Sequence, residues 1–214
     1  MDFKKLIVQS WNNTLNFIGP VLLITLVQLV VSVISFGILA PVTMAGYVQS
    51  FLRVTREGRK PEIGDLFSQM RLFLPLFLFY SLVVLVTVIG FTLLILPGFL
   101  VICFVAFGSF YLIPLMTDKG LGLFDALRTA WDHALSPPVS DHIIVAVIYV
   151  VIMSLGSSLP FAFLVTQPMA TFILVGAYME KVTREKLEET GAEVQPGGAH
   201  GPEAERPEAD NKEQ

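Results

Sequence analysis

Three long blocks of this 214-residue chain contain no Asp, Glu, Lys or Arg. They cover residues 6–52, 72–117 and 142–179 and are 47, 46 and 38 residues long, roughly twice the ~20 residues that a helix needs to cross a bilayer. One straight helix of that length would extend about 60–70 Å, whereas the hydrocarbon core is about 30 Å thick. Each block must therefore turn back on itself, and its length predicts two crossings.

The charged ends of the blocks favour an even number of crossings, because a charged side chain at the bilayer centre costs about 2.5–3.5 kcal/mol. We therefore predict an all-α membrane protein with six transmembrane helices arranged as three hairpins. The composition agrees, since 54% of the residues are hydrophobic and 15% are charged, against about 25% charged in soluble domains. All 14 Lys and Arg residues lie outside the blocks, so the positive-inside rule predicts that the charged loops and both termini are cytoplasmic.

Glycine and proline predict where each hairpin turns. In the first hairpin, residues 37–41 connect the arm 16–36 to an arm that starts near Pro41 and continues past Arg53. The other two hairpins have the arms 72–96 and 99–115 around Pro97-Gly98, and 142–155 and 160–179 around residues 156–158, where Pro160 opens the return arm.

The loops between the blocks carry apolar residues at helical spacing. Residues 63–70 and 123–135 are predicted to form short amphipathic helices at the headgroup level of the cytoplasmic face, where Trp131 is suited to the interface. The N-terminal segment, with Phe3, Leu6 and Trp11, is a looser third copy of this apolar pattern. Two interpretations stay open: an internal repeat of three amphipathic-helix-plus-hairpin units, or the ordinary composition of loop-to-span junctions.

Residues 1–182 are predicted to form one six-span membrane domain. The last helix is expected to extend beyond it, and the segment 183–214 then becomes rich in Gly, Pro, Glu and Ala. Such a composition buries too little apolar surface to fold. We therefore expect residues 183–214 to be a helical extension followed by a disordered acidic cytoplasmic tail.

Short motifs in the second hairpin, the loops and the last span resemble those of bacterial six-span inner-membrane proteins of unknown function. These are the YciC-like proteins and the membrane domain attached to some glycerophosphodiester phosphodiesterases. The resemblance covers residues 1–182 and implies a six-span fold in the bacterial inner membrane, but it does not carry over the phosphodiesterase reaction, whose catalytic domain is not in this chain. The motifs are Arg56-Glu57-Gly58, Asp65-Leu66-Phe67, Leu96-Pro97-Gly98, Pro114-Leu115, Asp118, Gly120, Gly122, Ala126-Leu127, Trp131, Gln167-Pro168 and Ala177-Tyr178.

Two sets of polar residues are the candidate sites. Gln28 and Gln167 lie near the middle of their spans and can form an interhelical amide hydrogen bond or, alternatively, a substrate contact. Basic residues next to the membrane can attract anionic lipid headgroups, although positive-inside topology alone would produce the same pattern. These candidate headgroup contacts are Lys4, Lys5, Arg53, Arg56, Arg59, Lys60 and Arg71.

The sequence offers little for catalysis. Asp132-His133 and Asp141-His142 could be read as a metal or acid–base cluster, but their spacing matches no known ligand motif, and polar helix ends explain them equally well. Cys103 is the single cysteine, inside an apolar run. We expect no enzyme activity, no cofactor, no metal and no nucleic-acid partner.

The predicted function is therefore that of an integral inner-membrane protein acting through lipid or protein contacts in the envelope. Its expected partners are the lipid bilayer, with anionic lipids in particular, and a membrane-protein partner or a second copy of the chain. The alternative is a small-molecule permease or a membrane subunit of an export complex.

Overall fold

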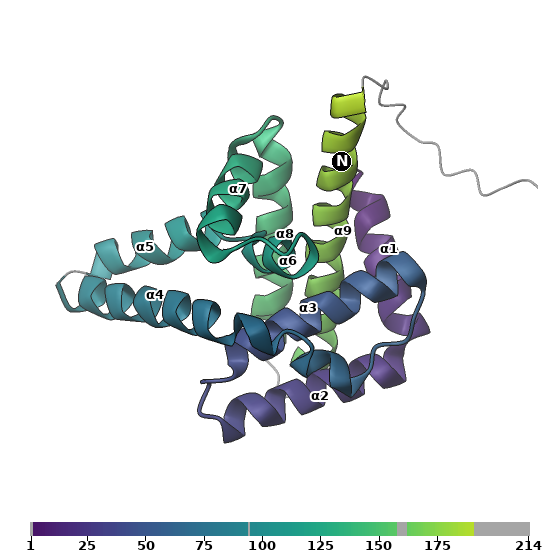
Figure 1. Cartoon of the computed structure of the whole chain (residues 1–214), viewed down its shortest axis with the longest axis horizontal. Helices are drawn as coiled ribbons and strands as arrows, with labels where there is room; N and C mark the ends of the chain where they lie inside the picture. The colour runs from purple at the N-terminus through teal and green to yellow at the C-terminus, as the bar shows by residue number, and fades with distance from the viewer. Residues whose placement is uncertain (1, 94, 158–161, 191–214) are drawn as a thin grey trace, which may run out of the picture. The chain divides into compact units, whose positions relative to one another are not determined.

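The structure is a computed structural model that describes residues 2–93, 95–157 and 162–190. Every regular element within these residues is helical (Figure 1). In chain order the elements are α1 (Phe3–Asn16), α2 (Ile18–Ile34), α3 (Ala40–Glu57), the 3-10 turns η1 (Ile63–Phe67) and η2 (Met70–Leu72), α4 (Phe73–Leu93), α5 (Ile95–Gly108), α6 (Leu112–Asp118), α7 (Leu123–Leu135), α8 (Val139–Ser157) and α9 (Phe163–Thr190).

The chain divides into two compact units, Met1–Lys181 and Val182–Gln214. The first contains the helices α1 to α8 and most of α9, and the second contains the end of α9. The predicted disordered tail lies beyond residue 190, outside the described residues.

Four stretches among the described residues are long and apolar enough to cross a membrane. A fifth arises if α1 and α2, which are bent by 89° relative to each other, form one broken span. The prediction of an all-helical protein is confirmed for the described residues, and several of its helices are long and apolar enough to span a membrane. Six spans and the three-hairpin layout remain predictions. The four stretches are Ile63–Thr92, Phe99–Asp118, Val139–Gly156 and Phe163–Leu187.

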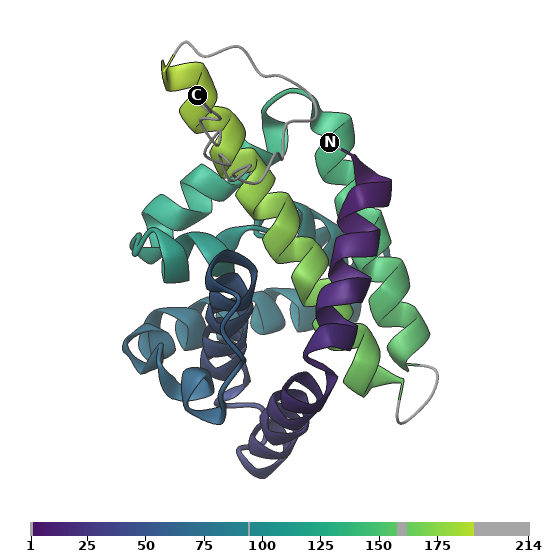
Figure 2. The ribbon, with the colours of Figure 1, turned by 90° about the vertical axis from the view of Figure 1, so that its right-hand side faces the viewer.

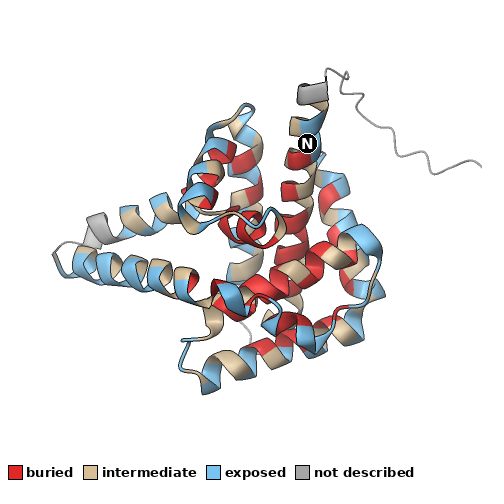
Figure 3. Cartoon of the chain, viewed as in Figure 1, coloured by how far each residue is buried: buried red, intermediate tan, exposed pale blue. Residues whose placement is uncertain are grey.

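Helix α3 is a core helix and is not among the stretches apolar enough to span. Gly37, at a φ of 80°, turns the chain after α2, and Pro41 begins α3 because its fixed φ suits the first helical turn. Buried residues then follow along the helix on most of its surface, as the red ribbon in Figure 3 shows. Gly58 ends α3 in a left-handed conformation, with its N–H bonded to the carbonyl of Val54.

Helices α4 and α5 form the antiparallel pair expected for the second block and run side by side (Figure 1). The turn, however, is not at Pro97-Gly98: α4 ends at Leu93 and α5 begins at Ile95, so that dipeptide lies inside the first turn of α5. Proline is tolerated there because the first N–H groups of a helix have no intrahelical acceptor. The return arm is also divided, because α5 ends at Gly108 and α6 starts at Leu112, with three residues between them.

The two predicted loop helices have different outcomes. Residues 63–70 form 3-10 turns where an amphipathic helix was expected, since the side chains of Glu62 and Asp65 cap each other's backbone N–H groups and hold a tight turn. Helix α7 spans the predicted residues 123–135. Of the third predicted turn, residue 158 and Pro160 lie outside the described residues.

Aromatic rings and small residues bring the core helices together. The rings of Tyr47 and Phe51 on α3 stack at 4.4 Å between centroids, and Phe51 meets Phe172 of α9 at 4.5 Å. Helix α1 lies beside α9 (Figures 1 and 2), where the side chain of Leu6 occupies the space that a β-carbon on Gly176 would fill. These contacts join the two ends of the first unit around α3.

Gly46→Ala is expected to destabilise the protein by about 1–3 kcal/mol. Helix α3 approaches η1 so closely that a β-carbon at position 46 would overlap the carbonyl oxygens of Asp65 and Leu66, and these belong to the backbone. The measurement is the melting temperature of purified protein in detergent. Gly19→Ala on α2 is the matched control, because no atom lies within 4 Å of its added carbon; equal melting temperatures for the two variants would contradict the close packing.

Candidate functional site

Asp65 collects four hydrogen bonds at the cytoplasmic end predicted for α3. Its carboxylate accepts from Ser50 Oγ at 2.7 Å, Arg53 Nη1 at 3.1 Å, Arg59 Nη2 at 2.6 Å and the backbone N–H of Glu62 at 3.2 Å. Arg59 also pairs with Glu62 at 3.0 Å. The positions 50 and 53 lie one turn apart on α3 and so share a face, and the left-handed turn after the helix returns the chain to that face.

Asp118, at the end of α6, forms a second carboxylate centre. Both terminal nitrogens of Arg56 on α3 bond to it, with Nη2 and Oδ2 2.8 Å apart. The hydroxyl of Tyr178 on α9 donates to the same Oδ2 at 2.9 Å. A bidentate guanidinium–carboxylate pair is a strong and directional contact, so this centre fixes α3, α6 and α9 together.

The seven predicted headgroup contacts therefore fall into two groups. Arg53, Arg56 and Arg59 bond to carboxylates of the chain itself. The other four are exposed, and none of them makes an ion pair with another described residue. These exposed residues are Lys4, Lys5, Lys60 and Arg71.

The two predicted intramembrane glutamines meet. Gln167 Nε2 on α9 donates to Gln28 Oε1 on α2 at 2.8 Å, and Gln28 Nε2 lies 3.3 Å from the sulfur of Met44 on α3. Both glutamines are buried. One turn before Gln28, the hydroxyls of Thr25 and Tyr47 are 2.7 Å apart. The result is a ladder of polar contacts that joins three helices inside an apolar core.

The two histidines weighed as a metal or acid–base cluster belong to an aromatic cluster. His142 Nε2 lies 3.1 Å from the carbonyl oxygen of Phe107, and the His142 ring packs edge-on against Phe107 and Phe110. The rings of both His142 and His133 contact Tyr111, with centroids 5.3 Å and 6.2 Å away. Across residues 2–93, 95–157 and 162–190, no three His, Cys, Asp or Glu side chains are grouped closely enough to hold a metal ion.

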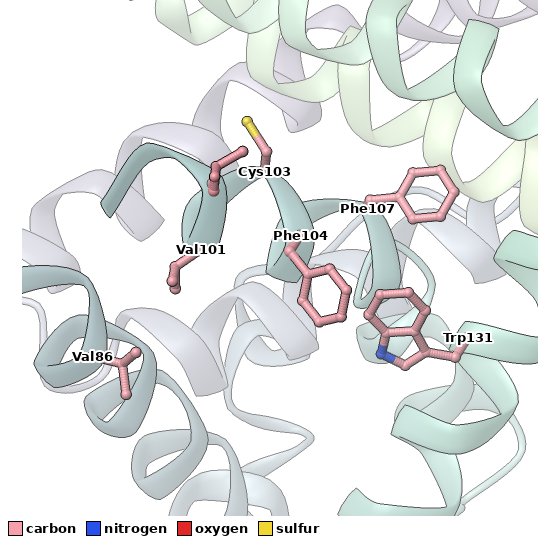
Figure 4. Close-up of a pocket in the computed structure, with 7 residues that line it drawn as sticks. Val86, Val101, Cys103, Phe104, Phe107 and Trp131 are labelled. Carbon is pink, nitrogen blue, oxygen red and sulfur yellow. The ribbon is translucent and has the colours of Figure 1, made fainter. Parts of the chain in front are cut away.

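Sequence reasoning missed the groove formed by α4, α5 and α7 (Figure 4). It is open along one side, has a volume of about 910 Å³ and is lined by apolar side chains. One signal in the sequence was Gly108, because a glycine leaves room for a large side chain to pack against its helix. That the large side chain is Trp131 cannot be known without the fold. The lining residues are Val86, Leu100, Val101, Cys103, Phe104, Phe107 and Trp131.

No protein-family model matches the chain, and no curated protein and no solved structure is detectably similar to it.

Asp65→Asn should lower the melting temperature at pH 7 by at least about 3 °C, because hydrogen bonds to charged groups contribute about 1.5–3 kcal/mol. Asp125→Asn, on the exposed side of α7, is the control and should behave like the parent protein. An Asp65→Asn variant as stable as the parent at pH 7 would show that the carboxylate is not a structural centre.

Proposed function

We propose that this chain is an integral protein of the bacterial inner membrane that works through contacts with lipid or with neighbouring membrane proteins, and that it has no catalytic activity. The motif resemblance to YciC-like proteins supports this assignment and the membership of that group. The observation that carries it is the apolar exposed surface of the long helices. On α4, a stripe at helical spacing is more than half exposed: Leu74 61%, Leu78 57%, Leu82 58% and Leu85 56%.

Helix α8 has an equivalent surface, on which Val147, Val150 and Leu155 are 55%, 61% and 63% exposed. Contiguous apolar surface of this extent marks a membrane or protein interface. The interior supports the same proposal, because Gln28 and Gln167 use their amides on each other and on Met44. No specific observation favours the alternative of a permease or export-complex subunit.

We propose six crossings with the charged loops and both termini in the cytoplasm, since all Lys and Arg residues lie outside the three charge-free blocks. Single cysteines at positions 37, 97 and 157, in a Cys103→Ser background, should react with a membrane-impermeant maleimide added outside intact spheroplasts. A cysteine at position 60 or 125 should react only after the membrane is permeabilised. Protection of position 37 from outside labelling would remove the crossings assigned to α2 and α3 while leaving the other two hairpins intact.

The headgroup contacts should be made by the four exposed basic residues and not by the three paired arginines. A Lys or Arg side chain near an anionic surface contributes about 1 kcal/mol, but a guanidinium already bonded to a carboxylate has less to gain. Adding phosphatidylglycerol to detergent-solubilised protein should therefore raise its melting temperature more than adding phosphatidylcholine does. The combined variant K4Q/K5Q/K60Q/R71Q should lose this difference.

The matched variant R53Q/R56Q should be less stable in both lipids, with the difference between the lipids retained. If the two lipids stabilise the parent protein equally, anionic headgroups are not its ligands. If R53Q/R56Q instead removes the difference, the paired arginines are the contact.

A further inference from the structure

The groove between α4, α5 and α7 combines an apolar wall with a polar end. Its volume of about 910 Å³ lies within the 300–1,000 Å³ that hold a drug-sized ligand. Every lining side chain is apolar or a thiol, apart from the indole N–H of Trp131. A ligand that fits such a groove has a long apolar part and a polar group at one end.

Trp131 is held at that end by α5. Its ring lies 4.5 Å from the ring of Phe104 and 6.1 Å from that of Phe107, centroid to centroid (Figure 4). The indole occupies the space that a β-carbon on Gly108 would fill. The position of the ring is therefore set by α5 and does not depend on a ligand.

The indole N–H has no hydrogen-bond acceptor among the described residues. Tryptophan is enriched at membrane interfaces because its ring is apolar and its N–H is a donor. Arg128 lies one turn earlier on α7, is exposed, and makes no ion pair within the described part of the chain. Residues three apart on a helix are neighbours, so a donor that lines the groove and a cation one turn away share one face of α7.

Helix α7 packs against the protein through a face of small residues, and Arg128 lies on an exposed part of the helix. Ala126, Ala130 and Ala134 face the protein, whereas Phe124 is 83% exposed and Leu135 is 58% exposed. The helix therefore packs through its small residues and Trp131 and presents Phe124 and Leu135 outward, as an interfacial helix presents apolar side chains. Groove, indole and guanidinium then lie in the order in which a lipid presents its acyl chain, ester and phosphate.

We propose that this groove binds one acyl chain of a phospholipid, whose ester oxygen accepts from the Trp131 indole and whose phosphate pairs with Arg128. This inference rests on the proposed membrane function and adds a specific site to it. The lipid is recognised by its phosphate and one acyl chain. Asp125 and Asp132 lie on the same helix as Arg128 and offset its charge, so the site does not favour headgroups with negative charge beyond that of the phosphate.

The test uses Trp131 as its own reporter. The chain has two tryptophans, so Trp11→Phe leaves Trp131 alone. In dodecyl maltoside, phosphatidylglycerol with brominated acyl chains should quench the fluorescence of Trp131 saturably, at about one lipid per chain. Diacylglycerol with the same brominated chains, which lacks the phosphate, should need about tenfold more lipid for half-quenching.

Four variants in that background separate the parts of the site. Arg128→Gln should raise the half-quenching concentration about tenfold, and Arg128→Lys should restore most of the affinity. Val101→Phe, which fills the groove, should abolish saturation, whereas Val147→Phe on the exposed surface of α8 should not. Circular dichroism and gel filtration verify that each variant is folded.

Two outcomes overturn the site and leave the proposed function standing. The first is quenching that rises linearly with lipid concentration and is the same in Val101→Phe. The second is a Cys103–Cys103 cross-linked dimer that excludes the quencher, which would assign the groove to a second copy of the chain. A complete lack of quenching by any brominated lipid would contradict both the site and the membrane location of α7.

Discussion

Three guanidinium groups gather where α3 ends, and two carboxylates hold them there. Asp65 is supplied by the 3-10 turn that follows in sequence, and Asp118 by the distant helix α6. Without these partners, the charged side chains at the end of this helix would have to be solvated by water or by headgroups. With them, α3 can be the centre of a bundle whose other helices, α4 and α8 among them, carry the exposed apolar side chains. The position of α3 in the fold thus depends on the ion pairs at its C-terminal end.

Much of the helical layout could be predicted from the sequence. The bounds of α7, the turn at Gly37 and the start of α3 near Pro41 follow from local signals. The role of α3 as the central helix could not be predicted, because an apolar sequence has the same composition whether protein or lipid surrounds it. The position of Pro97 was misjudged for a related reason, since a proline suits both a turn and the first turn of a helix.

The candidate sites were predictable as residues but not as contacts. That Gln28 and Gln167 could pair was suggested by their depth in two spans, and they are hydrogen-bonded. Which basic residues are free of acidic partners was not predictable, because Arg56 meets an aspartate 62 positions away. Charge along a sequence records where a side chain can lie relative to the membrane, whereas only the fold determines whether another part of the chain has already neutralised it.

The glutamine pair also bears on how the protein is made. Its two members are 139 residues apart in sequence, so at about 5–20 residues per second the second is synthesised about 7–28 s after the first. Throughout that time the amide of Gln28 has no partner on α9, and a buried amide without a hydrogen-bond partner is costly. The contact between Gln28 and Gln167 therefore forms only after α9 has been synthesised. The packing of α2 against α9 is one of the last steps by which this bundle is assembled, although α2 is among the first helices to be made.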